Sequence, residues 1–180
     1  MYGDGKVGNS NEENQSMMQP LLDDRKNLSQ VVIGAYEAAK KLEEVDNSKI
    51  AIMGYCFGGL VSLDLARSGV DLKGAASFHG FLSGSEDLPD AEIQAKLLVL
   101  HGHLDPMVGL DQIESFTKEM DAKSVDWQLH AFGNECMLLL ILRQMIQVLE
   151  LFIQVMPTRD LGKFLKIFYL KFLADIREIF

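Results

Sequence analysis

The chain has 180 residues, of which 48% are hydrophobic and 24% charged, a composition typical of a soluble globular domain with its own core. Its formal net charge of -9 argues against nucleic acid or an anionic membrane as the partner. Two cysteines, Cys56 and Cys136, are too few for a disulfide framework. A reactive thiol fits a reducing compartment, so we expect a cytoplasmic protein, and the first residues contain no apolar signal core that would predict targeting.

The first element that we expect is a long helix at about residues 23–44. Residues 1–16 are polar and rich in glycine, which predicts a loop that leads to a helix start. Apolar residues then recur at helical spacing from Met17 to about Glu44. We expect Pro20 to break this run or to begin a helix.

A strand, a sharp glycine turn and a helix are predicted to follow one another between residues 49 and 66. The apolar run at residues 50–53 indicates a buried strand, and the amphipathic run from Leu60 to Ala66 indicates a helix. Between them stands the sequence G-Y-C-F-G-G, at residues 54–59. This is the layout of a nucleophile elbow, whose usual pattern is G-x-S-x-G, with a thiol at the central position.

The elbow pattern makes Cys56 a candidate nucleophile. A residue at the tip of so tight a turn has strained dihedral angles, and we expect Gly54 and Gly58 to avoid Cβ clashes there. The backbone N–H of Phe57, at the start of the helix, can donate to an oxyanion, and the helix dipole favours the reactive thiolate. The alternative is a buried structural cysteine beside glycines that pack the helix.

Three further strands and one helix are predicted after the elbow. The strands are expected at residues 72–78, 95–100 and 125–132, and the helix at about residues 109–123. Strands that alternate with helices predict a parallel sheet with helices on both faces, and sites in such sheets form at the carboxyl ends of the strands. Four side chains suited to catalysis lie at or just beyond predicted strand ends: Cys56, His79, His101 and Asp105.

Three motifs together resemble the dienelactone hydrolase family of α/β-hydrolases. They are G-Y-C-F-G-G at residues 54–59, H-G at residues 79–80 and H-G-H-L-D-P at residues 101–106. The segments at residues 17–20 and 23–25 resemble the family as well, and the likeness covers roughly residues 1–134. It implies an α/β-hydrolase-type doubly wound, mostly parallel sheet. Strands that normally precede this region in the family, with a second oxyanion donor, are expected to be missing here.

The resemblance also implies an ester hydrolase like carboxymethylenebutenolidase, in which a Cys–His–Asp triad opens a small lactone. It maps the nucleophile onto Cys56 and the acid onto Asp105. Asp105 follows a predicted strand end and can hold an imidazole in the required tautomer; the alternative is a turn residue before Pro106. We expect a small ester or lactone as the partner and no cofactor or metal, because His and acidic residues do not fall at ligand spacings.

The general base of the triad has no counterpart in the sequence. The family has a motif like G-N-A-M-H-A-F after the fourth strand, whereas here Gly133 and Asn134 are followed by Glu135 and Cys136. No histidine occurs between residues 131 and 180. The four histidines, which we interpret as structural or solvated, are His79, His101, His103 and His130. His103 is the least unsuitable substitute, because it is close to Asp105 in sequence.

A single-nucleotide deletion accounts for the sequence that follows Asn134. The codons AAT GCA ATG CAT GCT encode Asn-Ala-Met-His-Ala, and without the C of GCA they read Asn-Glu-Cys-Met-Leu, as in residues 134–138. With suitable codons, the restored frame continues with a long family-like sequence. We therefore interpret residues 1–134 as a partial α/β domain and residues 135–180 as a frameshifted tail.

The alternative is a genuine C-terminal helix, and Met137–Met156 has the length of a membrane span. Arg143 and Glu150 within it argue against a span.

Two functions remain open from the sequence. One is a hydrolase of small esters or lactones that is impaired by the loss of its base. The other is a catalytically inactive α/β-hydrolase remnant or interaction protein. A redox thiol protein is disfavoured because the chain has no C-x-x-C motif.

Overall fold

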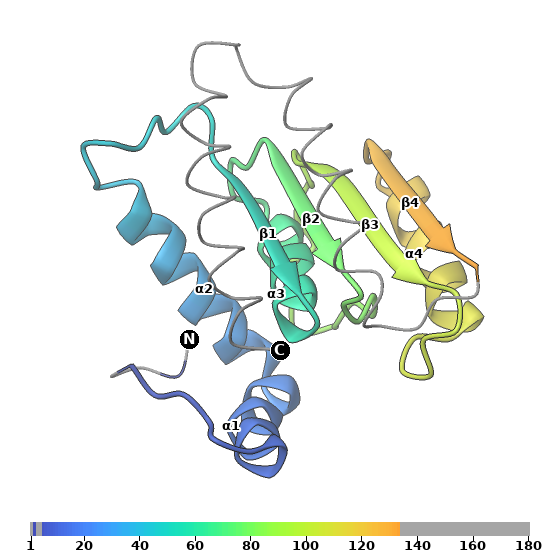
Figure 1. Cartoon of the computed structure of the whole chain (residues 1–180). Helices are drawn as coiled ribbons and strands as arrows, with labels where there is room; N and C mark the ends of the chain where they lie inside the picture. The colour runs from blue at the N-terminus through green and yellow to red at the C-terminus, as the bar shows by residue number, and fades with distance from the viewer. Residues whose placement is uncertain (1, 3–4, 134–180) are drawn as a thin grey trace. The chain divides into compact units, whose positions relative to one another are not determined.

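A four-stranded parallel sheet is the centre of the fold, in a computed structural model that describes residue 2 and residues 5–133 (Figure 1). The strands lie in the order β1-β2-β3-β4, and each pair of neighbours is parallel. Their bounds are Ala51–Tyr55, Gly74–Phe78, Lys96–Gly102 and Trp127–Phe132. All four strands stand where the sequence predicted them, and the mostly parallel α/β sheet is confirmed.

Two helices connect strands across the sheet, α3 (Phe57–Arg67) and α4 (Leu110–Ala122). Since the strands follow one another in one direction, right-handed crossovers place both helices on the same side, as Figure 1 shows. Their side chains join the strands in one hydrophobic core, together with α2 (Arg25–Ala39). Representative core residues are Leu28, Leu60, Leu97, Val99 and Phe116.

The opposite face of the sheet is buried too. Side chains alternate between the two faces along a strand, so Phe78, Leu98 and Leu100 point away from the core just described. All three are less than 9% exposed. Burial on both faces is typical of parallel sheets and explains why β2 and β3 are almost continuously apolar.

The N-terminal helices differ from the prediction. Helix α1 (Asn11–Asp23) begins within the segment predicted to be a loop, and Pro20 lies inside it. Ser10 caps this helix, because its hydroxyl accepts a hydrogen bond from the N–H of Glu13. No residue of α1 is buried, so water can reach the carbonyl that Pro20 leaves without a donor.

The second helix is shorter than the single long helix that we expected. A break at Asp24 separates α2 from α1, since its side chain accepts from the N–H of Asn27 and caps the new helix. Helix α2 then ends at Ala39, five residues before Glu44. In contrast, α4 matches its predicted range to within one residue at each end.

Within the described residues, no helix combines the length and the apolar character needed to cross a membrane. The segment at residues 137–156, the tail at 135–180 and the proposed boundary after residue 134 lie outside the described residues. They therefore stay predictions.

Candidate active site

The turn between β1 and α3 has the geometry of a nucleophile elbow. Strand β1 ends at Tyr55, α3 begins at Phe57, and Cys56 between them has φ 52° and ψ -119°. This left-handed conformation is costly for a residue with a side chain. Hydrogen bonds hold it, since Cys56 N–H donates to Phe78 O (2.9 Å) and Cys56 O accepts from Gly59 N–H (3.0 Å).

Two glycines give this turn the space that it needs: Gly54, as predicted, and Gly59 in place of the predicted Gly58. A Cβ on Gly54 would lie 2.0 Å from the backbone oxygen of Gly58, so the prediction for Gly54 is confirmed. A Cβ on Gly58 would meet no atom within 4 Å, so the prediction for Gly58 is wrong. The second close approach is at Gly59, where a Cβ would lie 2.6 Å from Ser77 Oγ and 3.0 Å from Gly80 Cα. Helix α3 packs there against the turn that follows β2.

Cys56 immediately precedes the first turn of α3, and its thiol makes no capping hydrogen bond to that turn. Cys56 is a free, half-buried cysteine, and Phe57 is the first residue of α3. The first N–H groups of an α-helix lack intrahelical partners and carry the positive end of its dipole. This arrangement can support an oxyanion that forms near the start of α3.

Asp105 lies in the loop after β3, at the same edge of the sheet. Its side chain is 6% exposed, and one carboxylate oxygen accepts a hydrogen bond from Met107 N–H (2.9 Å). The N–H of Asp105 donates to Gly102 O (2.9 Å). The carboxylate therefore stabilises the turn in which it lies, as the turn-residue alternative predicts. The same hydrogen bond fixes the carboxylate in place for a second hydrogen-bond donor.

Strand spacing sets the separation between the two candidate residues. Cys56 follows β1 and Asp105 follows β3, with β2 between these strands. Neighbouring strands lie about 4.8 Å apart, which puts the two loops roughly 10 Å from each other. Direct contact is thus not expected, and an imidazole fits the space between a thiol and a carboxylate so placed.

The two buried histidines lie close to this edge. His79 follows β2, has a left-handed φ of 40°, and stands one position beyond the register pair Tyr55 and Phe78, opposite Cys56. His101 lies near the end of β3, on the same face of the strand as the core residues Leu97 and Val99, and is 1% exposed. Burial lowers the pKa of His101 below 6.5, although the charge of Asp105 opposes this shift, and its Nδ1 has no hydrogen-bond partner among the described residues.

The other two histidines are exposed. The backbone N–H of His103 donates to Phe132 O (2.9 Å), and the His130 ring lies 3.4 Å from the Gln128 side-chain oxygen. The Asp105 carboxylate is bonded to a backbone N–H rather than to the His103 ring, so the structure does not support His103 as a substitute base.

Comparison with known proteins identifies the family. The model of the dienelactone hydrolase family matches residues 1–136. The chain belongs to the dienelactone hydrolase family.

Individual relatives agree with this assignment. A dienelactone hydrolase-like promiscuous phosphotriesterase from metagenomic libraries superposes with a TM-score of 0.69 at 33% identity, over 76% of this chain and 57% of that one. An uncharacterized Caenorhabditis elegans protein is 36% identical over 56% of this chain and 65% of its own length. A carboxymethylenebutenolidase homolog from Xenopus tropicalis is 28% identical over 52% of this chain and 37% of its own length. The chain thus spans between 37% and 65% of these relatives.

Aromatic contacts that the sequence did not reveal hold the ends of β1 and β2 together in this member of the dienelactone hydrolase family. The ring of Tyr55 stacks on that of Phe78 (centroids 4.5 Å apart) and lies 6.0 Å from that of His79. Burial raises the pKa of Tyr55. The motif G-Y-C places Tyr55 beside the candidate nucleophile, but its partners depend on the strand register, which the sequence does not state.

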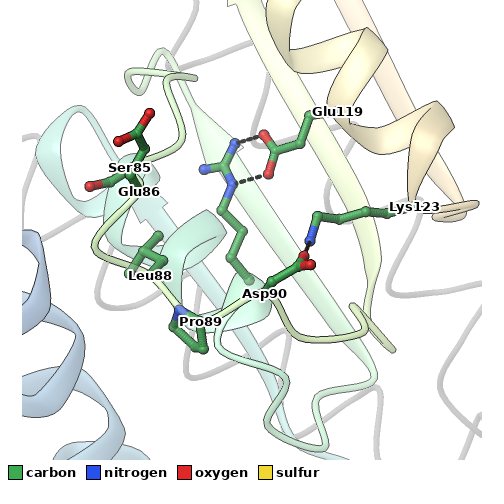
Figure 2. A pocket seen from close by; sticks show the side chains of 8 residues that line it. Ser85, Glu86, Leu88, Pro89, Asp90, Glu119 and Lys123 are labelled. Atoms are coloured by element: carbon green, nitrogen blue, oxygen red, sulfur yellow. Dashed lines mark hydrogen bonds and ion pairs between the residues drawn. The ribbon is translucent and has the colours of Figure 1, made fainter.

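A separate pocket of about 260 Å³ lies between the C-terminal ends of α3 and α4 and the loop before β3 (Figure 2). Arg67 and Glu119 form a bidentate ion pair in it, and Lys123 pairs with Asp90. These pairs already neutralise its cations. Cys56 directly precedes α3 and Arg67 is its last residue, so the pocket and the elbow lie at opposite ends of that helix. None of the candidate catalytic residues lines the pocket.

No group of three or more His, Cys, Asp or Glu side chains is arranged to hold a metal ion within residues 5–133.

Proposed function

We propose that this chain carries the acylating part of an ester or lactone hydrolase site, with Cys56 as the nucleophile. The observation that carries the proposal is the left-handed Cys56 between β1 and the first turn of α3. A strained residue directly before the first turn of a helix fits nucleophilic catalysis better than core packing. The half-buried rather than buried thiol also supports this role.

In the proposed reaction, the Cys56 thiolate attacks the carbonyl carbon of the ester. A bond forms between Sγ and this carbon, and the Phe57 N–H donates to the oxyanion. The bond from carbon to the alcohol oxygen then breaks, and the alcohol leaves with a proton. Water hydrolyses the thioester, which releases the acid and regenerates the thiol. A small ester or lactone is the substrate class, in keeping with the carboxymethylenebutenolidase homologs among the relatives.

Asp105 would orient a histidine that removes the proton from the thiol and later activates water. We propose that this histidine is encoded in the frame displaced after Asn134, where Asn-Ala-Met-His has become Asn-Glu-Cys-Met. The end of the family match at residue 136 supports this boundary. Without the histidine, the chain is an impaired hydrolase, and a reducing compartment such as the cytoplasm would keep its thiol reactive.

The second candidate is an inactive remnant of the fold. The bond from Met107 N–H to the Asp105 carboxylate favours it, because this carboxylate has a structural use that does not require catalysis.

Restoring the reading frame tests the proposal. Adding back one nucleotide after the Asn134 codon should raise the steady-state rate of p-nitrophenyl acetate hydrolysis by about a hundredfold or more, the usual contribution of a general base. The restored chain with Cys56→Ala is the control. If the restored chain and this control hydrolyse the ester at equal rates, Cys56 is not the nucleophile and the remnant interpretation holds.

A further inference from the structure

Exposed apolar side chains gather in the loop that carries Asp105. Among the described residues, six large hydrophobic side chains are exposed, and three of them lie in residues 103–110. This segment comprises the loop after β3 and the first residue of α4, and we call it the Asp105 loop. These are Leu104 (56% exposed), Met107 (47%) and Leu110 (68%). Single exposed apolar residues are common on protein surfaces, but a cluster beside a candidate site indicates binding.

The Asp105 loop is fixed by bonds that do not involve these apolar side chains. Met107 N–H donates to the Asp105 carboxylate, and Met107 O accepts from the Gln112 side chain (3.1 Å). The N–H of His103 donates to Phe132 O, which ties the loop to β4. Val108, 2% exposed, anchors the loop in the core. The exposed side chains are therefore presented by a rigid loop rather than by a loose one.

Residues 104–110 expose no charged side chain, although the exposed His103 and Asp111 flank them and the chain carries a net charge of -9. Asp105 is the only acidic or basic residue between Leu104 and Leu110, and it is buried. The loop thus offers no cation to an anionic ligand, whereas apolar groups gain by covering it.

We propose that Leu104, Met107 and Leu110 bind an uncharged apolar group of the substrate, so that hydrophobic esters are preferred over anionic ones. The inference rests on the proposed function, with the reacting carbonyl at Cys56. The Asp105 loop and the elbow lie at the same sheet edge, two strands or roughly 10 Å apart. A substrate whose carbonyl lies at Cys56 reaches this loop only through an acyl or alkyl group several carbons long.

Thiol alkylation tests the inference without requiring turnover. The full chain is treated with N-methylmaleimide, N-butylmaleimide and N-carboxymethylmaleimide, and the rate at Cys56 is read by peptide mass spectrometry, separately from Cys136. The butyl reagent has three more methylenes than the methyl reagent, and we expect them to become about half buried when it reacts. The butyl reagent should therefore react roughly eightfold faster than the methyl reagent. The anionic reagent should be the slowest.

Replacing the apolar side chains should remove this preference. In Leu104→Ser/Met107→Ser, we expect the butyl and methyl rates to agree within about twofold, a loss that follows from the missing apolar area. Leu42→Ser is the matched control, because Leu42 is also 56% exposed and lies between α2 and β1. Leu110→Ser, outside the turn around Asp105, should reduce the preference partially and serves if the double variant does not fold.

The outcomes separate this inference from the proposed function. If Cys56 reacts with every reagent only after unfolding in urea, the thiol is inaccessible and the proposed function fails. If Cys56 reacts in the folded chain without a butyl preference, or keeps the preference in the serine variants, the substrate inference is overturned. A preference that disappears as the protein concentration rises would assign the surface to a second copy of the chain and would also overturn it.

Discussion

Cys56 has a backbone conformation that costs on the order of 1–3 kcal/mol, and its neighbours compensate for this cost. The motif G-x-C-x-G-G predicted this strained residue correctly. It did not reveal which glycines are needed, because the contact at Gly59 comes from Ser77 in β2 and from Gly80 in the turn that follows, both distant in sequence. The role of Cys56 as nucleophile stays a prediction.

Alanine substitutions at two neighbouring glycines should have opposite consequences. Gly54→Ala brings a Cβ to 2.0 Å from backbone of α3, so we expect it to lower the free energy of unfolding by about 3 kcal/mol. Gly58→Ala meets no atom within 4 Å and should raise stability by roughly 0.5–1 kcal/mol, because alanine loses less entropy in a helix. Urea unfolding of both variants measures this difference; similar losses would contradict the geometry of the elbow.

His101 should make stability depend on pH. Its pKa in the folded chain is below the ordinary value of 6.5 because the ring is buried, so on acidification the unfolded chain takes up this proton first. Stability should therefore fall as pH drops from 6.5 towards the lower folded pKa. His101→Gln removes this contribution, and urea unfolding at pH 7.5 and 5.5 should show a smaller decrease than in the parent. The exposed His130→Gln should keep the decrease of the parent; an equal change in both variants would contradict the assignment.

The helices show which element boundaries could be predicted from the sequence. Ser10, with Glu13 three positions later, forms a pattern that could have located the start of α1. Asp24 is a residue type that commonly caps helices, which could have indicated the start of α2. The hydrophobic spacing dominated the prediction instead and joined two helices into one. The end of α2 at Ala39 has no comparable sequence signal, so tertiary packing decides it.

Buried ion pairs connect α2, α3 and α4, and no sequence pattern predicted them. Arg25 of α2 binds both carboxylate oxygens of Asp64 in α3 (2.6 and 2.7 Å). Arg67 of α3 lies 3.4 Å from the same carboxylate and pairs with Glu119 of α4. Both arginines also donate to backbone carbonyls of the loop after β2. The network thus fixes α3, and with it the elbow, against its neighbours.

Removing the central carboxylate should destabilise the domain. Asp64→Asn leaves two buried arginines short of one negative charge, and we expect the free energy of unfolding to fall by about 3–5 kcal/mol. The exposed pair between Glu114 and Lys118 offers the control, because Glu114→Gln should have little effect on the unfolding midpoint. Comparable midpoints for the two variants would show that the buried network does not hold α3 in place.

At the scale of the whole molecule, the sequence predicted the parallel α/β sheet, its four strands and the dienelactone hydrolase family. Alternation of short apolar runs with amphipathic helices carries the fold, and the motifs around Cys56 and Asp105 carry the family. The contacts that link β1, β2 and β3 at the site were not predictable. They depend on strand register and on backbone approaches between distant segments, which a linear pattern does not specify.

The central claim is that the chain retains an acylating thiol and lacks the base that completes turnover. Its most direct test is to incubate the full chain, as encoded, with p-nitrophenyl acetate and to follow acetylation of Cys56 by peptide mass spectrometry over time. We expect the acetyl group to accumulate on Cys56 to about one equivalent and to persist, because thioester hydrolysis lacks its general base. An intact chain whose Cys56 stays unacetylated, while exposed nucleophiles elsewhere in it react, would contradict the account.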